Sequence, residues 1–352
     1  MKSTTFKPDS LPALIGSLPL KDHDEATSLV FEYTPEIPLW VQLPHYKEER
    51  LLTQFAEGLP GIKEQGDDLF FDTEAHDFDE KLLFFFEQYL AVTEGDVPIA
   101  DSIFAFSEKT GKGFNAFLRH ASANKDGVAA LKGQITGPFT MSTGLKDRHG
   151  KDAYYHPQLR DAVTKAIAMK AKYQVEEMKK ISNNVIIFLD EPGLSGYGSS
   201  SMVGIPRDEI INALSEATES IHQSGGLSGI HVCANTDWSL IFSIEPNIIS
   251  FDAYGFFDRI ILYKKDLSAF IKKGGIIAWG LVPTLNVDDL RMEDSESLYK
   301  RWEEHAKRLD LPMETIKKQS LITPSCGTGL LPLKLAVKAL KLTRELSQRI
   351  RD

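Results

Sequence analysis

The chain has 352 residues, with 40 basic and 50 acidic side chains and a formal net charge of −10 at neutral pH. This balance argues against nucleic acid or an anionic membrane as a partner, because phosphate binding needs a basic surface. No apolar stretch approaches the roughly 20 residues that cross a bilayer. No apolar core follows the N-terminal segment 1–5, so we expect no secretory signal. The two cysteines, Cys233 and Cys326, exclude a disulfide scaffold and indicate a reducing cytoplasm.

Short apolar runs alternate with longer amphipathic segments along the chain. Several runs are rich in Ile and Val and lack polar alternation, which is typical of parallel strands buried on both faces. The pattern predicts eight strands, in chain order Leu11–Leu18, Pro38–Leu43, Ala130–Thr140, Val185–Leu189, Gly229–Cys233, Ile248–Asp252, Ile276–Val282 and Ser320–Pro324.

Helical spacing between the runs predicts helices, the clearest at Pro157–Ile181, Pro206–His222 and Pro332–Ile350. Eight strands with helices between them predict one α/β domain over residues 1–352, folded as a (β/α)8 TIM barrel. A doubly wound open sheet is the alternative, and the helix after the eighth strand favours closure. Residues 58–126, between strands two and three, are predicted to form a helical insertion, with helices at Glu80–Ala91 and Phe114–His120.

Polar residues end several of the predicted strands. The C-terminal ends of barrel strands carry the chemistry in this architecture, so these residues are the candidates for function. They are Gly16 and Ser17 after strand one, His45 after strand two, Asp190 at strand four, His231 and Cys233 on strand five, Asp252 at strand six, and Cys326 after strand eight.

A metal site is predicted where both cysteines meet a histidine. His231 and Cys233 are two residues apart on one strand and therefore point to the same side. Cys326 and Asp252 can reach the same space from other strand ends of a closed barrel. Imidazole, thiolate and carboxylate together suit tetrahedral Zn²⁺. The alternative is a satisfied core histidine with two small buried cysteines. The second cysteine at another strand end favours zinc.

Several motifs, in the same order, resemble cobalamin-independent methionine synthase. Ile15-Gly16-Ser17 resembles the turn that opens the catalytic barrel of that family. Thr136-Gly137-Pro138 and Asp190-Glu191-Pro192 resemble its strand-three and strand-four motifs. The His-x-Cys pair at His231 and the late Cys326-Gly327 resemble its zinc ligands. The match covers most of the chain outside the insertion, and the length resembles the short, single-barrel members.

This resemblance implies a zinc-dependent methyltransferase that produces methionine. The methyl donor implied for the short members is methylcobalamin or a methylated corrinoid protein, and the acceptor is the thiol of L-homocysteine. His231, Cys233 and Cys326 would hold catalytic zinc, with Asp252 as a fourth ligand. The substrate-binding residues would include Ile15, Gly16, Ser17, His45 and Asp190. Asp190 would pair with the ammonium group, and Ser17 with the amides around Gly16 would hold the carboxylate.

The sequence departs from the family at three places. Asp252 stands where the family has Glu, and His45, near Glu48 and Glu49, stands where it has a substrate-binding Glu. The stretch Gly280–Thr284 lacks the family's histidine, so no acid–base role is carried over. The alternatives are a corrinoid-dependent methyltransferase acting on another thiol such as coenzyme M, a protein resembling uroporphyrinogen decarboxylase, and a non-catalytic zinc or corrinoid-binding module.

Overall fold

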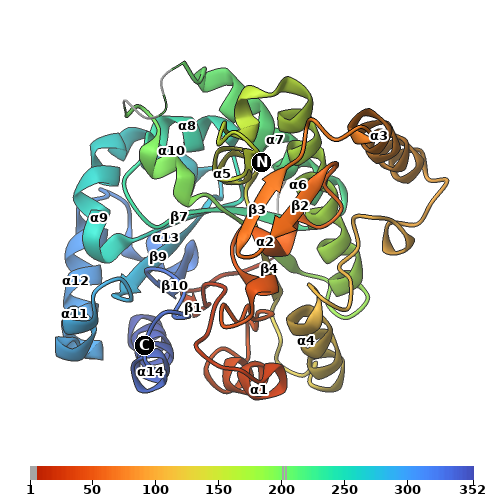
Figure 1. Cartoon of the computed structure of the whole chain (residues 1–352). Coiled ribbons are helices and arrows are strands. Elements are labelled where there is room, and N and C mark those ends of the chain that lie inside the picture. The colour runs from red at the N-terminus through yellow and green to blue at the C-terminus, as the bar shows by residue number, and fades with distance from the viewer. Residues whose placement is uncertain (1–5, 200–201, 203) are drawn as a thin grey trace.

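The computed structural model describes residues 6–199, 202 and 204–352, so the N-terminal segment 1–5 considered above lies outside the described residues. Strands and helices alternate along most of the chain (Figure 1). The strands are β1 Leu11–Pro12, β2 Ile62–Gln65, β3 Asp68–Phe71, β4 Leu131–Thr136, β5 Lys146–Asp147, β6 Val185–Asp190, β7 Leu227–Val232, β8 Ile248–Phe251, β9 Ile276–Val282 and β10 Ser320–Pro324. The α-helices are α1 His23–Tyr33, α2 Thr53–Ala56, α3 Phe78–Glu94, α4 Lys112–Ala123, α5 Pro138–Gly144, α6 Pro157–Lys179, α7 Arg207–Gln223, α8 Trp238–Ile244, α9 Ala253–Ile260, α10 Lys264–Lys272, α11 Val287–Met292, α12 Ser295–Lys307, α13 Met313–Lys318 and α14 Leu333–Arg351.

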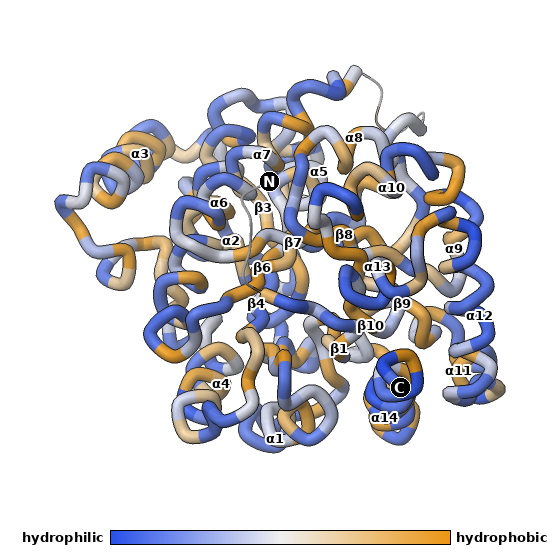
Figure 2. The backbone as a smooth tube through the Cα atoms, turned by 180° about the vertical axis from the view of Figure 1, so that it is seen from behind, coloured by the Kyte–Doolittle hydropathy of each residue, from blue (hydrophilic) through white to orange (hydrophobic). Residues whose placement is uncertain are grey.

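The main sheet of the described residues has seven strands in the order β1-β10-β9-β8-β7-β6-β4. Every neighbouring pair in it is parallel. The sheet curls into a half-barrel with helices packed around it, and hydrophobic residues concentrate along the central strands (Figure 2). The prediction of a parallel α/β architecture is therefore confirmed at this level.

The predicted second strand, Pro38–Leu43, is not a regular strand. It makes isolated parallel bridges, Ser17 to Gln42 on one side and Leu39 to Lys132 on the other. Side chains take up part of its hydrogen-bonding capacity: the Trp40 carbonyl accepts from Gln134 Nε2, and the Leu43 amide donates to a buried glutamate, Glu49. The prediction of eight regular strands is thus wrong by one in the described chain, because these contacts interrupt the ladder.

Strands one and three are shorter than predicted. Strand one keeps regular pairing only at Leu11–Pro12, and it then turns at Gly16, whose φ is +21°. Strand three ends at Thr136, and Pro138 begins α5. Proline is favoured in the first turn of a helix, where no amide hydrogen is required. The predicted strand Ala130–Thr140 therefore contains a helix start.

The predicted insertion contains strands as well as helices. Its helices α3 and α4 overlap the predicted Glu80–Ala91 and Phe114–His120. Strands β2 and β3 form an antiparallel hairpin, and β3 pairs with β5 in a second, three-stranded sheet. A purely helical insertion is therefore wrong, because residues 62–71 pair locally.

The last helix, α14, packs beside α1 and β1. Ser347 Oγ donates to the Ser10 carbonyl at 2.7 Å, and both residues are fully buried. None of the helices in the described ranges combines the length and apolarity that a bilayer crossing requires.

Candidate metal centre

The inner face of the half-barrel brings two of the predicted residues, Asp190 and His231, into one row with Ser250. Asp190 on β6 pairs in register with His231 on β7, and His231 pairs with Ser250 on β8. Side chains alternate between the two faces of a strand, so the apolar Ile230 and Val232 pack outward into the helix-facing core. The row lies at the C-terminal ends of the strands, as the sequence predicts for the chemistry.

His231, Cys233 and Cys326 form a compact group of potential ligands. Their ligand atoms all lie within 4.8 Å of one another. His231 is 3% exposed, whereas both cysteines are half-buried, so the group is reached from the cysteine side. Both cysteines are free. The structure therefore brings together the histidine and the two cysteines that the sequence singled out.

The histidine is oriented for metal binding. Its Nδ1 lies 2.9 Å from Ser250 Oγ, and its Nε2 is buried with no hydrogen-bond partner among the described residues. A buried polar atom without a partner is costly, and a metal ion would satisfy it. Metal-bound histidines usually hold a hydrogen bond through the other ring nitrogen, as Ser250 provides here. The residues present therefore fit a metal ion with nitrogen and sulfur ligands.

The two thiols shift each other's pKa in opposite directions. A hydrogen bond from the Cys326 thiol, with help from His231, lowers the pKa of Cys233 to about 4 against the effect of burial. The same hydrogen bond and burial raise the pKa of Cys326 above its usual value. Two adjacent thiolates repel each other, and a divalent cation bound between them would offset that electrostatic repulsion.

Asp252 lies beside this group but is engaged elsewhere. It caps α9, where its Oδ1 accepts the Gly255 amide hydrogen at 2.8 Å. Burial raises the pKa of Asp252 to about 6, and the backbone hydrogen bonds from Gly255 and Tyr254 oppose that shift. Its carboxylate is not among the ligand atoms that lie within 4.8 Å of one another. His231, Cys233 and Cys326 are therefore the three potential ligands that the described chain brings together here.

Asp190 and Glu191 have different surroundings. The Glu191 carboxylate is fully buried and accepts hydrogen bonds from the Phe139 and Thr140 amides and from Thr140 Oγ1. It therefore caps α5, and a Cβ at Gly137 would lie 2.1 Å from it, so that position requires glycine. Asp190 Oδ1, in contrast, is buried and has no hydrogen-bond partner in the described chain.

The charge of Asp190 interacts with the metal-ligand group. Burial raises the pKa of Asp190, and its Coulombic interactions with His231 and Lys132 oppose that shift. Lys132 itself is 1% exposed, with Nζ 4.0 Å from the centroid of the Phe188 ring. Burial lowers the pKa of Lys132 to about 8, against the attraction of Asp190. One basic and one acidic group therefore lie inside the half-barrel near the cysteines.

The turn Ile15–Ser17 packs against the loop that follows Cys326. The Ser17 carbonyl accepts from both the amide and the hydroxyl of Thr328, and Ser17 Oγ accepts from the Gly329 amide. A Cβ at Gly327 would lie 2.4 Å from Ser17 Oγ, so this close approach depends on glycine. The contact places the predicted substrate turn next to the metal-ligand group.

His45 is not brought into that group. It lies in an exposed turn, where its ring meets Tyr46 edge-on with 5.2 Å between ring centroids. The neighbouring Glu49 is buried and bonds to His23 and to the Leu43 amide. Glu49 therefore stabilises the turn that follows Pro38–Leu43.

Three residues of the site, Ser250, Lys132 and Thr284, are not among those predicted from the sequence. Ser250 lies two residues before Asp252 on the same strand face, a spacing that could have found it. Lys132 is a charge within an otherwise apolar predicted strand, which was also a signal. Thr284 carries no sequence signal, and its contacts are described below.

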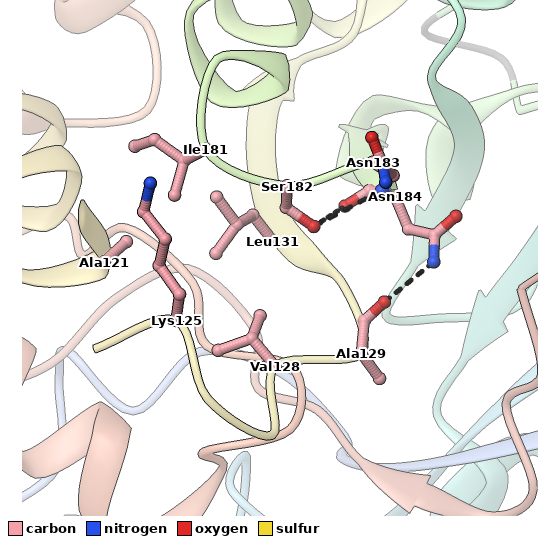
Figure 3. A pocket seen from close by; sticks show the side chains of 9 residues that line it. All are labelled: Ala121, Lys125, Val128, Ala129, Leu131, Ile181, Ser182, Asn183 and Asn184. Atoms are coloured by element: carbon pink, nitrogen blue, oxygen red, sulfur yellow. Dashed lines mark hydrogen bonds between the residues drawn. The ribbon is translucent and has the colours of Figure 1, made fainter. Parts of the chain in front are cut away.

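A cavity of about 270 Å³ lies at the other end of the strands (Figure 3). It is lined by residues that precede or begin β4 and β6, including Leu131 and Asn184. Asn184 Nδ2 donates to the Ala129 carbonyl at 2.9 Å, which joins the two strand starts. The N-terminal face of such a sheet serves stability, so we do not place function there.

A search with models of known protein families finds no match to this chain, and a search of curated protein sequences finds none either.

Proposed function

We propose that this chain is a zinc-dependent methyltransferase that moves a methyl group from methylcobalamin or a methylated corrinoid protein to the thiol of L-homocysteine, giving methionine. The observation that carries the proposal is the convergence of His231, Cys233 and Cys326, with His231 Nε2 lacking a hydrogen-bond partner among the described residues. The order of motifs described above supports it. The free thiols suit the reducing cytoplasm expected from the sequence.

The chemistry follows from the donor set. Zinc bound by one imidazole and two thiolates would accept the substrate sulfur as a thiolate, which is the reactive form of a thiol. That sulfur would displace the methyl group from the donor: an S–C bond would form, the Co–C bond would break, and its electron pair would remain with the reduced corrinoid. Binding to zinc would release the thiol proton to solvent, so the reaction would need no separate general base at Gly280–Thr284.

The remaining residues would recognise the amino acid. Asp190 has a free carboxylate oxygen for the ammonium group, and Glu191 does not because α5 takes both of its oxygens. The turn at Gly16 and Ser17 would hold the carboxylate. We propose that residues 38–43 act as an irregular eighth strand that completes the barrel, since they form bridges to Ser17 on one side and to Lys132 on the other.

A second acceptor class is favoured by one observation. Lys132 is a buried basic group inside the half-barrel, and an anionic thiol without an amine, such as coenzyme M, would use such a group. Asp190 next to the cysteines favours homocysteine instead, because a carboxylate repels a sulfonate. The two acceptors are compared directly in the assay below.

The deciding assay incubates zinc-loaded protein with methylcobalamin and either homocysteine or coenzyme M, and measures the methylated product. We expect methionine, with little product from coenzyme M, and no product above background with Cys326→Ser. Methyltetrahydrofolate in place of methylcobalamin should give a much lower rate. A zinc-loaded protein that methylates neither thiol would refute the proposal, and faster methylation of coenzyme M would replace the acceptor.

A further inference from the structure

Cys326 is held in place by the side chain of Thr284. Thr284 follows the end of β9 and is 5% exposed. Its hydroxyl oxygen accepts the Cys326 amide hydrogen at 2.9 Å and donates to the Cys326 carbonyl at 3.0 Å. One side-chain atom thus binds both backbone polar groups of a residue that carries a potential metal ligand.

The neighbouring Ser325 completes the arrangement. The Thr284 amide donates to Ser325 Oγ at 3.0 Å, and the two hydroxyl oxygens lie 3.1 Å apart. A threonine hydroxyl has one hydrogen to donate and two lone pairs to accept with. The Thr284 hydroxyl donates its hydrogen to the Cys326 carbonyl and accepts hydrogens from the Cys326 amide and the Ser325 hydroxyl. All of its hydrogen-bonding capacity is therefore used, although the group is buried.

The backbone needs this support because the sheet ends there. The register between β10 and β9 shifts between Thr323 and Pro324, and the last ladder-like bond runs from the Ser325 amide to the Val282 carbonyl. Beyond that bond no strand pairing fixes Cys326 among the described residues. The Thr284 hydroxyl supplies the hydrogen bonds to the Cys326 backbone beyond the end of the strand pairing.

We propose that Thr284 is a positioning residue of the metal centre, which fixes the backbone of Cys326 so that its Sγ stays within 4.8 Å of the ligand atoms of His231 and Cys233. The inference rests on the proposed function in one respect, that the three residues bind a metal ion. Valine has nearly the same shape as threonine but can neither donate nor accept at this position. Serine keeps the hydroxyl and loses only a methyl group.

The test compares Thr284→Val with Thr284→Ser and the unmodified protein. Zinc affinity is measured by competition with a chromophoric chelator, and the absorption spectrum of the Co²⁺-loaded protein reports ligand geometry. We expect Thr284→Val to weaken zinc binding by about 10- to 100-fold, the usual effect of losing a group that orients a ligand, and to shift the cobalt bands. Thr284→Ser should stay close to the unmodified protein in both measurements.

A matched control separates this role from the general effect of removing a buried hydroxyl. Thr343 is fully buried on α14, and its hydroxyl donates to the Ala339 carbonyl. Thr343→Val should lower thermal stability without changing zinc affinity or the cobalt spectrum. If Thr284→Val does not fold, Thr284→Ala removes the same hydroxyl without adding a branched side chain, and the same loss is expected.

The outcomes distinguish this inference from the proposed function. Unchanged zinc affinity and cobalt bands in Thr284→Val would overturn the positioning role alone. An equal loss in Thr284→Val and Thr284→Ser would also overturn it, because packing and not the hydroxyl would then be responsible. If the unmodified protein binds neither metal, the proposed metal-dependent function falls together with this inference.

Discussion

At the scale of single residues, the structure separates side chains that the sequence presents as equivalent. Asp190 and Glu191 are adjacent acids at the end of β6, but Glu191 caps α5 and Asp190 keeps a free oxygen. Asp252 and Asp190 both end strands beside the cysteines, but Asp252 is bound to the first turn of α9. The side chain with free capacity is the better candidate for binding substrate, and a side chain that already caps a helix is a poorer one.

Asp190→Asn should weaken homocysteine binding strongly and leave zinc content unchanged. Removing one partner of a buried carboxylate–ammonium pair weakens the binding free energy by roughly 2–5 kcal/mol, because the other charge is left without compensation. The matched ligand is 4-mercaptobutyrate, which is homocysteine without its amine. Calorimetric titration of both thiols into the zinc-loaded variant measures the contrast.

Equal weakening of both thiols by Asp190→Asn would show that Asp190 supports the fold of the site and does not read the amine. A drop in zinc content would instead place Asp190 with the metal ligands.

Asp252→Asn should leave zinc affinity within about twofold of the unmodified protein, since asparagine is as good a helix cap as aspartate. Asp252→Ala should lower the free energy of unfolding by about 0.5–2 kcal/mol through loss of the cap on α9. Chelator competition and urea unfolding measure the two effects. A large loss of zinc affinity in Asp252→Asn would make Asp252 the fourth ligand that the resemblance implies.

At the scale of elements, the motifs Thr136-Gly137-Pro138 and Asp190-Glu191-Pro192 contact each other and connect the ends of β4 and β6. Glu191 binds the first turn of α5, Gly137 leaves room for its carboxylate, and Thr140 Oγ1 accepts the Gly193 amide hydrogen. Two neighbouring strands are thus fastened together at the edge of the site. The sequence placed these motifs at strand ends but could not show that they contact each other.

Glu191→Gln tests this contact through its pH dependence. Burial raises the pKa of Glu191 to about 7, from an ordinary value of 4.5. Between these values the folded chain holds a proton that the unfolded chain has lost, so the free energy of unfolding falls as the pH rises from about 4.5 to 7. The contribution of Glu191 is largest below pH 4.5 and declines by about 3 kcal/mol by pH 7.

Glu191→Gln cannot titrate and should lack this decline. Urea unfolding of both proteins at pH 5 and pH 7.5 gives the difference between them at each pH. The advantage of the unmodified protein should be greater at pH 5. A difference that is the same at both pH values would contradict the assignment.

The sequence located most strands because burial on both faces leaves a plain apolar run. The predictions Ile276–Val282 and Ser320–Pro324 match β9 and β10 in full, and Val185–Leu189 is one residue short of β6. Prediction failed where pairing depends on partners remote in sequence. The Trp40 carbonyl binds Gln134, so the apolar run around it does not become a regular strand.

The same reasoning applies to the site. His231, Cys233 and Cys326 were found because cysteine is rare in this chain and strand alternation is simple. Thr284 was not found because threonine is common and its proposed role rests on two hydrogen bonds to the Cys326 backbone across the sheet. Residues that bear the chemistry are visible in sequence, whereas residues that hold them in place depend on geometry.

At the scale of the whole molecule, the helices of the described chain differ in how much of their surface is buried, as α6 and α3 show. Helix α6 has 23 residues, of which 14 are buried against the sheet and neighbouring helices. Helix α3 has 17 residues, of which Leu82, Phe85 and Val92 are buried. Figure 1 shows α3 standing away from the sheet at the edge of the molecule. Local stability should follow this difference, because opening a helix with few buried apolar contacts costs little free energy.

Hydrogen exchange followed by mass spectrometry should therefore show two classes of helix. Amides of α3 should exchange at least about tenfold faster than those of α6, since α3 can open without disturbing the sheet. The strands β6 to β9, which lie in the middle of the sheet, should be the slowest of all. Three large side chains of α3 are more than half exposed, Leu83 at 61%, Phe84 at 51% and Leu90 at 52%, so water already reaches much of this helix. If α3 exchanges as slowly as α6, its exposed apolar side must be covered in solution, and a search for the covering chain by crosslinking from Leu83→Cys would follow.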